Sequence, residues 1–347
     1  MDAALTLPVR TSNTSSNPLG LVTLVRIGSM AVRRTDEQLA EAARLYYLDG
    51  LNQGEIAEAL ETTRSNVSRM LASARDQGIV RFHVSHPLGR QHVLEERLVE
   101  TFGLREALVL SADAGGDVLA RTGDLAARWL AERIVDGQTL AVSWGRTLKA
   151  MAQHVHVDRA REVRVVQIGG DLQLDPRLSG HDLVRDLAAR LGGGYSYLHA
   201  PALLDSPQMV ADLRANTNIS RELDKARSAD LAIVGIGGFG EGFSAQIVES
   251  AHLTAAERAE LESREPAGDI AARFFDDEGK PFDSPLRDRV LALEFDELRQ
   301  IPLVVGVAAG NEKARGVWGA LRGRLIDVLV CDQSAAAAAL RLQNEVP

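Results

Sequence analysis

Apolar residues recur at three- and four-residue intervals near the start of the chain. They are Leu39, Ala42, Ala43, Tyr46 and Tyr47 in residues 36–49, then Ile56, Ala57 and Leu60 in the first half of residues 52–75, and Val67, Met70, Leu71 and Ala74 in its second half. This spacing places the apolar side chains of each segment on one helical face. We therefore predict three amphipathic helices that close on a shared core, with a tight turn between the last two.

The last of these helices directs polar side chains to solvent, most of them in its first turn. Arginine pairs with guanine and asparagine with adenine, while a helix N-terminus favours a phosphate. The residues that we expect to contact DNA are Gln53, Thr63, Arg64, Ser65, Asn66, Ser68 and Arg69. The pattern is typical of a helix-turn-helix DNA reader. Its turn holds Glu61 where many such motifs have glycine, and a positive φ there would cost about 1 kcal/mol.

The segment that follows Gly78 changes from helical spacing to alternation. In residues 79–84, apolar side chains alternate with Arg81 and His83, which predicts one strand of a small wing. Residues 62–86 carry four arginines against one aspartate, whereas the whole chain has a net charge of −9. A basic island in an acidic protein indicates an anionic partner such as the DNA backbone. The alternative is a polar helical hairpin on the surface of some other domain.

Beyond residue 87, predicted helices alternate with short apolar runs. A helix over residues 91–102 and a strand over 107–110 form a predicted linker and entry strand. The later runs are residues 140–142, 163–168, 231–236, 303–307 and 327–330. Alternating strands and helices predict a mostly parallel, doubly wound α/β sheet. Such sheets bind ligands at the carboxyl ends of their strands, so the loops after these runs are candidate sites.

The loop after the first of these runs has the features of a phosphate cradle. Ser143, Gly145, Arg146 and Thr147 lie where a strand passes into a helix, so that hydroxyls, a guanidinium and free backbone N–H groups converge. An ordinary strand-to-helix turn with a packed Trp144 would have the same sequence. Both interpretations remain open from this loop alone.

Two other loops contain candidate ligand contacts. Lys313 lies in the first turn of a predicted helix, where a cation opposes the helix dipole unless an anion lies nearby. Asp269 is suited to accept hydrogen bonds from sugar hydroxyls, although a solvated turn carboxylate would look the same.

Other kinds of chemistry have less support. Residues 235–240 match the GxGxxG dinucleotide pattern, but no second strand ending in an acidic residue follows about twenty residues later. The histidines and the single Cys331 lack the spacing of a metal site, and no Ser, His and Asp arrangement indicates a catalytic triad. We therefore expect no metal, no cofactor and no catalytic residues.

The size of the chain adds a second domain to this picture. With 347 residues it is much longer than a DNA-binding unit of about fifty residues. Its 45% hydrophobic residues form no stretch that approaches a membrane span, and a lone cysteine suits the reducing cytoplasm. Residues 1–33 are rich in Ser, Thr and Asn and match a signal peptide poorly. We expect them to be a disordered arm or an upstream extension.

The order of the motifs resembles a known family. The helix-turn-helix is followed by VSWGRTL at residues 142–148, VVQIGG at 165–170, LAIVGIG at 231–237, GDIAARFFDDEG at 268–279 and IPLVVGVAAGNEKARGVWGALRG at 301–323. Together they resemble the SorC family of bacterial sugar-responsive transcriptional regulators, over about residues 36–342. The resemblance implies a C-terminal domain similar to sugar-phosphate isomerases and deaminases that serves as an effector sensor, in a protein that is typically a tetramer.

The resemblance also assigns roles to residues. It places the effector phosphate at Ser143, Gly145, Arg146 and Thr147, with Gly169 and Gly170 nearby, and it places Asp269 and Lys313 in the pocket. The chain departs from the family in two places. It reads QIGG where relatives often read QLNGG, and it has Ala271-Ala272 where they often have Cys-Gly. These departures favour a ligand that differs from the better-known ones.

The combined prediction has an arm over residues 1–33, a winged helix-turn-helix domain over 34–87, a linker helix and entry strand over 88–115 and an α/β effector domain over 116–342. The main hypothesis is a regulator, not an enzyme, whose affinity for double-stranded operator DNA changes when a phosphorylated sugar or small polyol binds, with no membrane partner. The alternative is a sugar-phosphate isomerase or deaminase, or a nicotinamide-dependent enzyme, with a helical appendage. A general base poised in the crevice would distinguish the enzyme.

Overall fold

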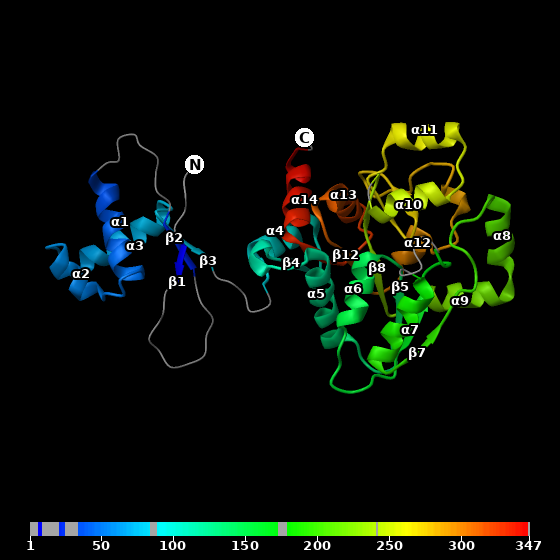
Figure 1. The fold of residues 1–347 in the computed structure, drawn as a ribbon, viewed down its shortest axis with the longest axis horizontal. Coiled ribbons are helices and arrows are strands. Elements are labelled where there is room, and N and C mark those ends of the chain that lie inside the picture. Colours follow the sequence, from blue (N-terminus) through cyan, green and yellow to red (C-terminus); the bar gives the residue numbers. More distant parts are fainter. Residues whose placement is uncertain are drawn as a thin grey trace. The chain divides into compact units, whose positions relative to one another are not determined.

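The structure is a computed structural model that describes residues 6–8, 21–24, 34–83, 89–172, 179–240 and 242–345. The chain divides into two compact units, Met1–Pro87 and Leu88–Pro347 (Figure 1). The boundary lies at residue 87, where the predicted winged helix-turn-helix domain ends.

The first unit contains the three expected helices. They are α1 (Arg34–Tyr47), α2 (Gln53–Ala59) and α3 (Arg64–Asp76). Asn52 caps α2 in a capping box with Glu55, and Thr63 caps α3 by accepting the N–H of Asn66, as polar residues do at helix N-termini. Ile56, Val67 and the predicted alanines of α1 and α3 form a buried core. Helical spacing in the sequence therefore identified this core correctly.

A small antiparallel sheet completes this unit. Its strands lie in the order β1 (Thr6–Pro8), β2 (Leu21–Leu24) and β3 (Val80–His83). β3 is the expected wing strand, and Val22 of β2 pairs in register with Phe82. The range expected as a disordered arm thus contributes two strands, because residues 21–24 have the apolar and β-branched composition that a strand favours. The rest of that range lies outside the described residues.

The turn between α2 and α3 has a positive φ at the position where the sequence has Glu61 and many related motifs have glycine. Glu61 has a φ of +48° and is exposed. We expect Glu61→Gly to stabilise the first unit by about 0.5–1 kcal/mol, because glycine adopts this conformation without the Cβ penalty. Hydrogen exchange of amides in α1 to α3 measures the change. Glu58→Gly is the matched control, since glycine inside α2 should cost about 1 kcal/mol. A loss of stability in both variants would refute the prediction.

The second unit is built on a seven-stranded parallel sheet with the strand order β4-β13-β12-β8-β5-β6-β7. The strands are β4 (Glu106–Leu110), β5 (Thr139–Val142), β6 (Arg164–Gln167), β7 (Gly194–Ser196), β8 (Leu231–Gly235), β12 (Val304–Ala308) and β13 (Val328–Asp332). The predicted doubly wound α/β class is confirmed. β5, β8 and β12 are neighbours, so their carboxyl ends meet at one edge of the sheet.

The segment predicted as linker and entry strand, residues 88–115, belongs to this unit. It contains α4 (His92–Phe102) and β4, which pairs with β13 at one edge of the sheet. Buried Glu95 joins the two elements, because it accepts the N–H of Val109 at 2.8 Å and pairs with Arg90 at 2.8 Å. β4 is therefore the edge strand of the large sheet as well as the strand through which the chain enters it.

Successive strand residues point to opposite faces, and helices cover both (Figure 1). Val328 and Val330 pack on one face with α5 (Val118–Arg133), α6 (Arg146–His154) and α7 (Gly180–Leu191), whereas Leu329 and Cys331 pack on the other. That second face is covered by α4, α9 (Thr217–Arg227) and α14 (Gln333–Glu345). Period-two alternation in runs that are apolar throughout is expected for a sheet buried on both faces.

A second, smaller sheet is formed by residues that follow β8 in the sequence. Its strands are β9 (Gly237–Gly238), β10 (Gly268–Ile270) and β11 (Arg273–Phe275), and β10 pairs antiparallel with both others. These strands are too short and too rich in glycine to be recognised from an apolar pattern. β9 contains glycines of the GxGxxG match and pairs with β10, which is not the turn from strand into helix that dinucleotide binding uses.

The remaining helices are α8 (Pro207–Ala215), α10 (Gly242–Ser250), α11 (Ala255–Arg264), α12 (Phe295–Leu298) and α13 (Ala314–Arg322). Of these, α13 packs on α14 and on the small sheet. Within the described part of the chain, no helix combines the length and the apolar composition that crossing a membrane requires.

Candidate functional site

A cavity of about 40 Å³ lies at the carboxyl ends of β5, β8 and β12. Its lining comes from the loop before α6, from the segment between β8 and α10, from the turn after β10 and from the start of the segment before α13. The lining residues are Trp144, Gly145, Arg146, Thr147, Leu148, Gly235, Ile236, Gly237, Gly238, Gly242, Ser244, Asp269, Ala271, Glu312 and Lys313. This volume is about three times what one water needs, so it suits a group the size of a phosphate.

A glycine lies at the start of each of two helices beside the cavity, α6 and α10. Gly145 caps α6 with a φ of +141°, a conformation that L side chains rarely adopt. Gly242 begins α10, and a Cβ there would lie 2.5 Å from a guanidinium nitrogen of Arg146. The N-terminus of α6 and the Arg146 side chain therefore both face the cavity, and α10 begins beside that side chain.

Two cationic side chains lie close together in the cavity. Lys313 donates from Nζ to Thr147 Oγ1 at 3.3 Å. Burial, together with the positive charge of Arg146, lowers the pKa of Lys313 to about 8. No ion pair of Arg146 or Lys313 with an acidic side chain occurs among the described residues. Two cations held together without such a pair favour an anion between them.

Asp269 forms the acidic side of the cavity. It is 5% exposed, accepts the Ser244 hydroxyl and the N–H of Ala272 at 3.2 Å, and has its pKa raised by burial. Ala271 and Ala272 both have positive φ, at +53° and +64°. Two consecutive non-glycine residues in this region strain the hairpin turn by about 1–2 kcal/mol each. The turn thus holds a buried carboxyl group against the cavity.

The comparisons with known proteins agree with this architecture. Residues 86–341 match the family described as "Putative sugar-binding domain". The chain is 31% identical to the sorbitol operon regulator of Klebsiella pneumoniae over 87% of its length and 97% of that protein. It is 31% identical to the deoxyribonucleoside regulator of Bacillus subtilis over 88% of its length and 98% of that protein.

A solved structure extends the likeness to the fold. The full-length sorbitol operon regulator SorC from Klebsiella pneumoniae superimposes with a TM-score of 0.66 at 30% identity, over 88% of this chain and 98% of that one. The chain belongs to the SorC family of transcriptional regulators. The predicted family is thereby confirmed, and so is the pairing of a regulator with a sugar-binding domain.

This SorC-family chain brings most of the expected effector residues into the cavity. Those that line it are Gly145, Arg146, Thr147, Asp269 and Lys313. Ser143 does not line it. Its hydroxyl accepts the N–H of Gly235 at 3.0 Å and thereby ties the loop after β5 to the end of β8. Ser143 therefore supports the loop that lines the cavity.

Gly169 and Gly170 lie outside the set that lines the cavity. A Cβ on Gly169 would lie 2.7 Å from Ala292 Cβ, and one on Gly170 would lie 2.5 Å from the backbone of Pro201. Close backbone approach explains both glycines without a ligand.

Sequence reasoning missed several lining residues, among them Gly237, Gly238, Gly242 and Ser244. They come from the segment that follows β8, and the pairing of β9 with β10 brings that segment to Asp269. The GxGxxG match was the available signal, because it marks a backbone that permits close approach. Among the described residues, no group of three or more His, Cys, Asp or Glu could hold a metal ion.

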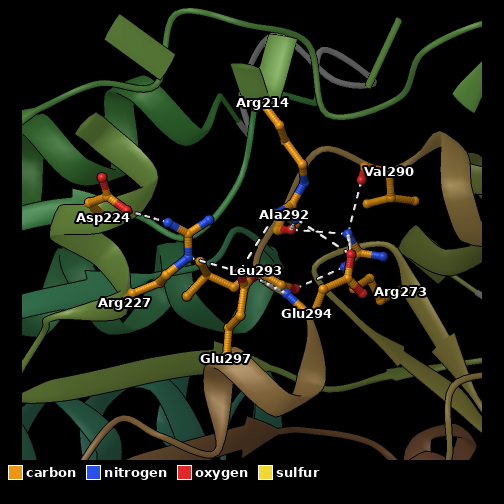
Figure 2. Close-up of polar contacts among 9 residues, drawn as sticks. All are labelled: Arg214, Asp224, Arg227, Arg273, Val290, Ala292, Leu293, Glu294 and Glu297. Carbon is orange, nitrogen blue, oxygen red and sulfur yellow. Dashed lines mark hydrogen bonds and ion pairs between the residues drawn. The ribbon is translucent and has the colours of Figure 1, made fainter. Parts of the chain in front are cut away.

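Arg273 anchors the other end of the strained turn in this regulator. It is 7% exposed and donates to the carbonyl oxygens of Leu293 at 2.8 Å and of Val290 and Ala292 at 3.0 Å, and it pairs with Glu294 at 2.6 Å. Burial lowers its pKa to about 10. Figure 2 shows Arg273 together with Arg214 and Arg227, which reach Glu294 and Glu297 from α8 and α9. The turn of the cavity is therefore joined to the segment before α12.

The predicted DNA-contacting residues gather at the start of α3. Thr63, Arg64, Ser65, Asn66, Ser68 and Arg69 are all exposed, and Gln53 is half-buried at the start of α2. Asn66 donates to Thr62 Oγ1 at 2.7 Å, which orients its amide. This face of α3 is therefore exposed to solvent.

Proposed function

We propose that this SorC-family regulator binds double-stranded operator DNA through the exposed face of α3 and changes that affinity when a phosphorylated sugar or small polyol enters the cavity. The observation that carries the proposal is that two cationic side chains, Arg146 and Lys313, both line the cavity at the N-terminus of α6. Cations, a helix N-terminus and the Thr147 hydroxyl together suit a phosphate, and Asp269 suits a sugar hydroxyl. The names of the relatives support both partners.

The mechanism of the switch is thermodynamic linkage. An effector changes DNA affinity only by binding one state of the protein more tightly than another, and DNA must then change effector affinity by the same factor. We propose that the chain acts as a homo-oligomer, with the tetramer typical of the family. A dimeric reader would place its half-sites about 10 base pairs apart or at a multiple of that spacing.

Gel shift across a panel of sugar phosphates tests the proposal. We expect at least one compound to change operator affinity by about 5–150-fold, the range of ordinary allosteric coupling. The same compound should raise the melting temperature of the protein, because it binds only the folded state. If no compound does either, the proposal of a sensor is wrong.

Alanine substitution of Arg64, Asn66 and Arg69 tests the DNA surface. Each change should weaken operator binding by about 1–3 kcal/mol where the side chain reads a base. Effector binding should stay intact, because these residues lie outside the α/β unit. Arg128→Ala, on α5, is the matched control for the loss of an exposed arginine. Unchanged operator affinity in all three variants would place the DNA surface elsewhere.

We also propose that the cavity binds its effector without converting it. The relatives are named as regulators, and Asp269 is engaged by Ser244 and Ala272. Incubation of the best-binding compound with the protein, followed by product analysis, tests this. Conversion that depends on Asp269 would favour the enzyme alternative.

A further inference from the structure

Glu312 is an acidic residue of the cavity lining that has no role in the proposed function. It directly precedes Lys313, and it is exposed although it lines the cavity, which places it at the mouth. Within the described part of the chain, its carboxylate takes part in no ion pair and in no side-chain hydrogen bond. An ionised carboxylate only accepts hydrogen bonds, so it is available to a donor at this mouth.

Two glycines fix the position of this acidic residue. A Cβ on Gly310 would lie 2.2 Å and 2.4 Å from the two carboxylate oxygens of Glu312, so the side chain folds back onto the backbone that follows β12. Gly310 has a φ of +108°, which L side chains rarely adopt. A Cβ on Gly238 of β9 would lie 2.3 Å from the carbonyl oxygen of Glu312. The carboxylate is therefore held at the carboxyl end of β12, where the cavity lies.

The carboxylate lies near the cations of the cavity without neutralising either of them by direct contact. Burial is the main cause of the lowered pKa of Lys313, and among the negative charges that oppose this lowering, Glu312 acts more strongly than Asp269. Glu312 forms no ion pair with Lys313, although the two residues are adjacent in the sequence. Its charge therefore acts on the cavity at a distance.

A bound phosphate would leave this negative charge without a counter-charge in the lining. Arg146 and Lys313 are the two cations that line the cavity, and a phosphate monoester carries a charge of about −1.5 to −2 at pH 7. The phosphate thus matches both cations. The remainder of the effector then meets Glu312 at the mouth. Hydroxyl groups donate hydrogen bonds to a carboxylate, whereas a second anionic group is repelled by it.

We propose that Glu312 is a specificity-determining residue, which admits effectors with an uncharged sugar or polyol part and rejects those with a second anionic group, such as phosphorylated sugar acids. This inference rests on the proposed function, because the phosphate must bind at Arg146 and Lys313. It narrows the effector class to phosphate monoesters of neutral sugars and polyols. A like charge placed against the wrong ligand is a common source of specificity.

Calorimetric titration of the full-length chain at pH 7 tests this discrimination with two matched pairs of probes. Glycerol 3-phosphate and 3-phosphoglycerate share one carbon skeleton, as do sorbitol 6-phosphate and 6-phosphogluconate. The members of each pair differ by a terminal hydroxymethyl group against a carboxylate. We expect wild type to bind at least one alcohol about tenfold more tightly than its acid partner, and Glu312→Gln to reduce that ratio to within about threefold, because the glutamine keeps the size and loses the charge.

The ratio within a pair is the decisive quantity, because removal of a negative charge near Lys313 should strengthen the binding of every phosphate. Inorganic phosphate measures that general gain. Glu96→Gln is the matched control, since Glu96 is exposed on α4, which does not line the cavity. The same change in net charge at this position should leave both ratios unchanged.

The outcomes separate the role of Glu312 from the proposed function. If wild type binds both members of each pair equally well, or binds the acids more tightly, the inference is wrong and the phosphate site stands. If Glu312→Gln strengthens every probe alike and keeps the preference for the alcohol, another residue makes the distinction and the inference is also wrong. If wild type binds neither inorganic phosphate nor any of the four esters, the proposed function fails, and the inference fails with it.

Discussion

Replacement of Arg273 by methionine should destabilise the α/β unit by about 3–5 kcal/mol, because it removes several hydrogen bonds of a buried guanidinium and leaves carbonyl oxygens desolvated without that donor. The guanidinium donates to four backbone carbonyl oxygens, those of Arg287, Val290, Ala292 and Leu293. Methionine fills much of the volume but donates to none of them. The carbonyl groups of Val290 and Leu293 would then lose this donor while buried, which carries a desolvation cost, whereas that of Ala292 keeps Arg214 as a donor.

Fluorescence during denaturant unfolding measures this loss selectively, because all three tryptophans, Trp129, Trp144 and Trp318, lie in the α/β unit. Arg299→Met is the matched control. Arg299 pairs with the highly exposed Asp296, and such surface pairs contribute about 0–1 kcal/mol. A loss below about 1 kcal/mol in Arg273→Met would show that the network in Figure 2 contributes little to stability.

The same substitution should affect effector binding in the protein that remains folded. Arg273 directly follows the turn of Ala271 and Ala272, whose positive φ angles are strained. Strained turns persist only where the surroundings hold them. Asp269 depends on that turn, because the N–H of Ala272 is one of its hydrogen-bond donors. Loss of the anchor should therefore loosen the acidic side of the cavity.

The fold was predictable where apolar residues form continuous runs in the sequence. Runs such as residues 231–236 and 303–307 are apolar throughout and became β8 and β12 with small shifts at their ends. Gly237 and Gly238 offered no such pattern, because β9 exists only through its pairing with β10. A strand that depends on a distant partner leaves no local signal.

The candidate site was likewise predictable only where neighbouring residues in the sequence supply it. Gly145, Arg146 and Thr147 were recognisable because one loop supplies the glycine, the cation and the helix N-terminus. Ser244 was not, since only the folded chain brings it to Asp269. Ser143 has the side chain chemistry of a ligand contact, but its hydroxyl bonds to the backbone of Gly235. Sequence alone does not distinguish a hydroxyl that binds a ligand from one that supports the loop.

Lys313→Met should reduce affinity for a sugar phosphate by about 100-fold, because a buried charge-assisted hydrogen bond to phosphate contributes about 1.5–3 kcal/mol and its loss leaves the anion less compensated. Inorganic phosphate should lose affinity to a similar extent. Lys225→Met is the matched control, since Lys225 pairs with Glu222 on α9, which does not line the cavity. Unchanged phosphate affinity in Lys313→Met would remove this lysine from the site.

The pH dependence of binding gives Lys313 a signature that a structural role would not produce. Its pKa in the free protein is about 8, and a bound phosphate raises that pKa because an opposite charge favours the charged form. Below pH 8 the lysine is charged with or without effector, so affinity there does not depend on its titration. Above pH 8 binding must take up a proton, and affinity should fall by up to tenfold per pH unit until the pKa of the complex is reached. Titrations between pH 7 and 9.5 measure this fall. Lys313→Arg should bind phosphate without it, since arginine stays charged throughout, and a fall that persists in Lys313→Arg would assign the titration to another group.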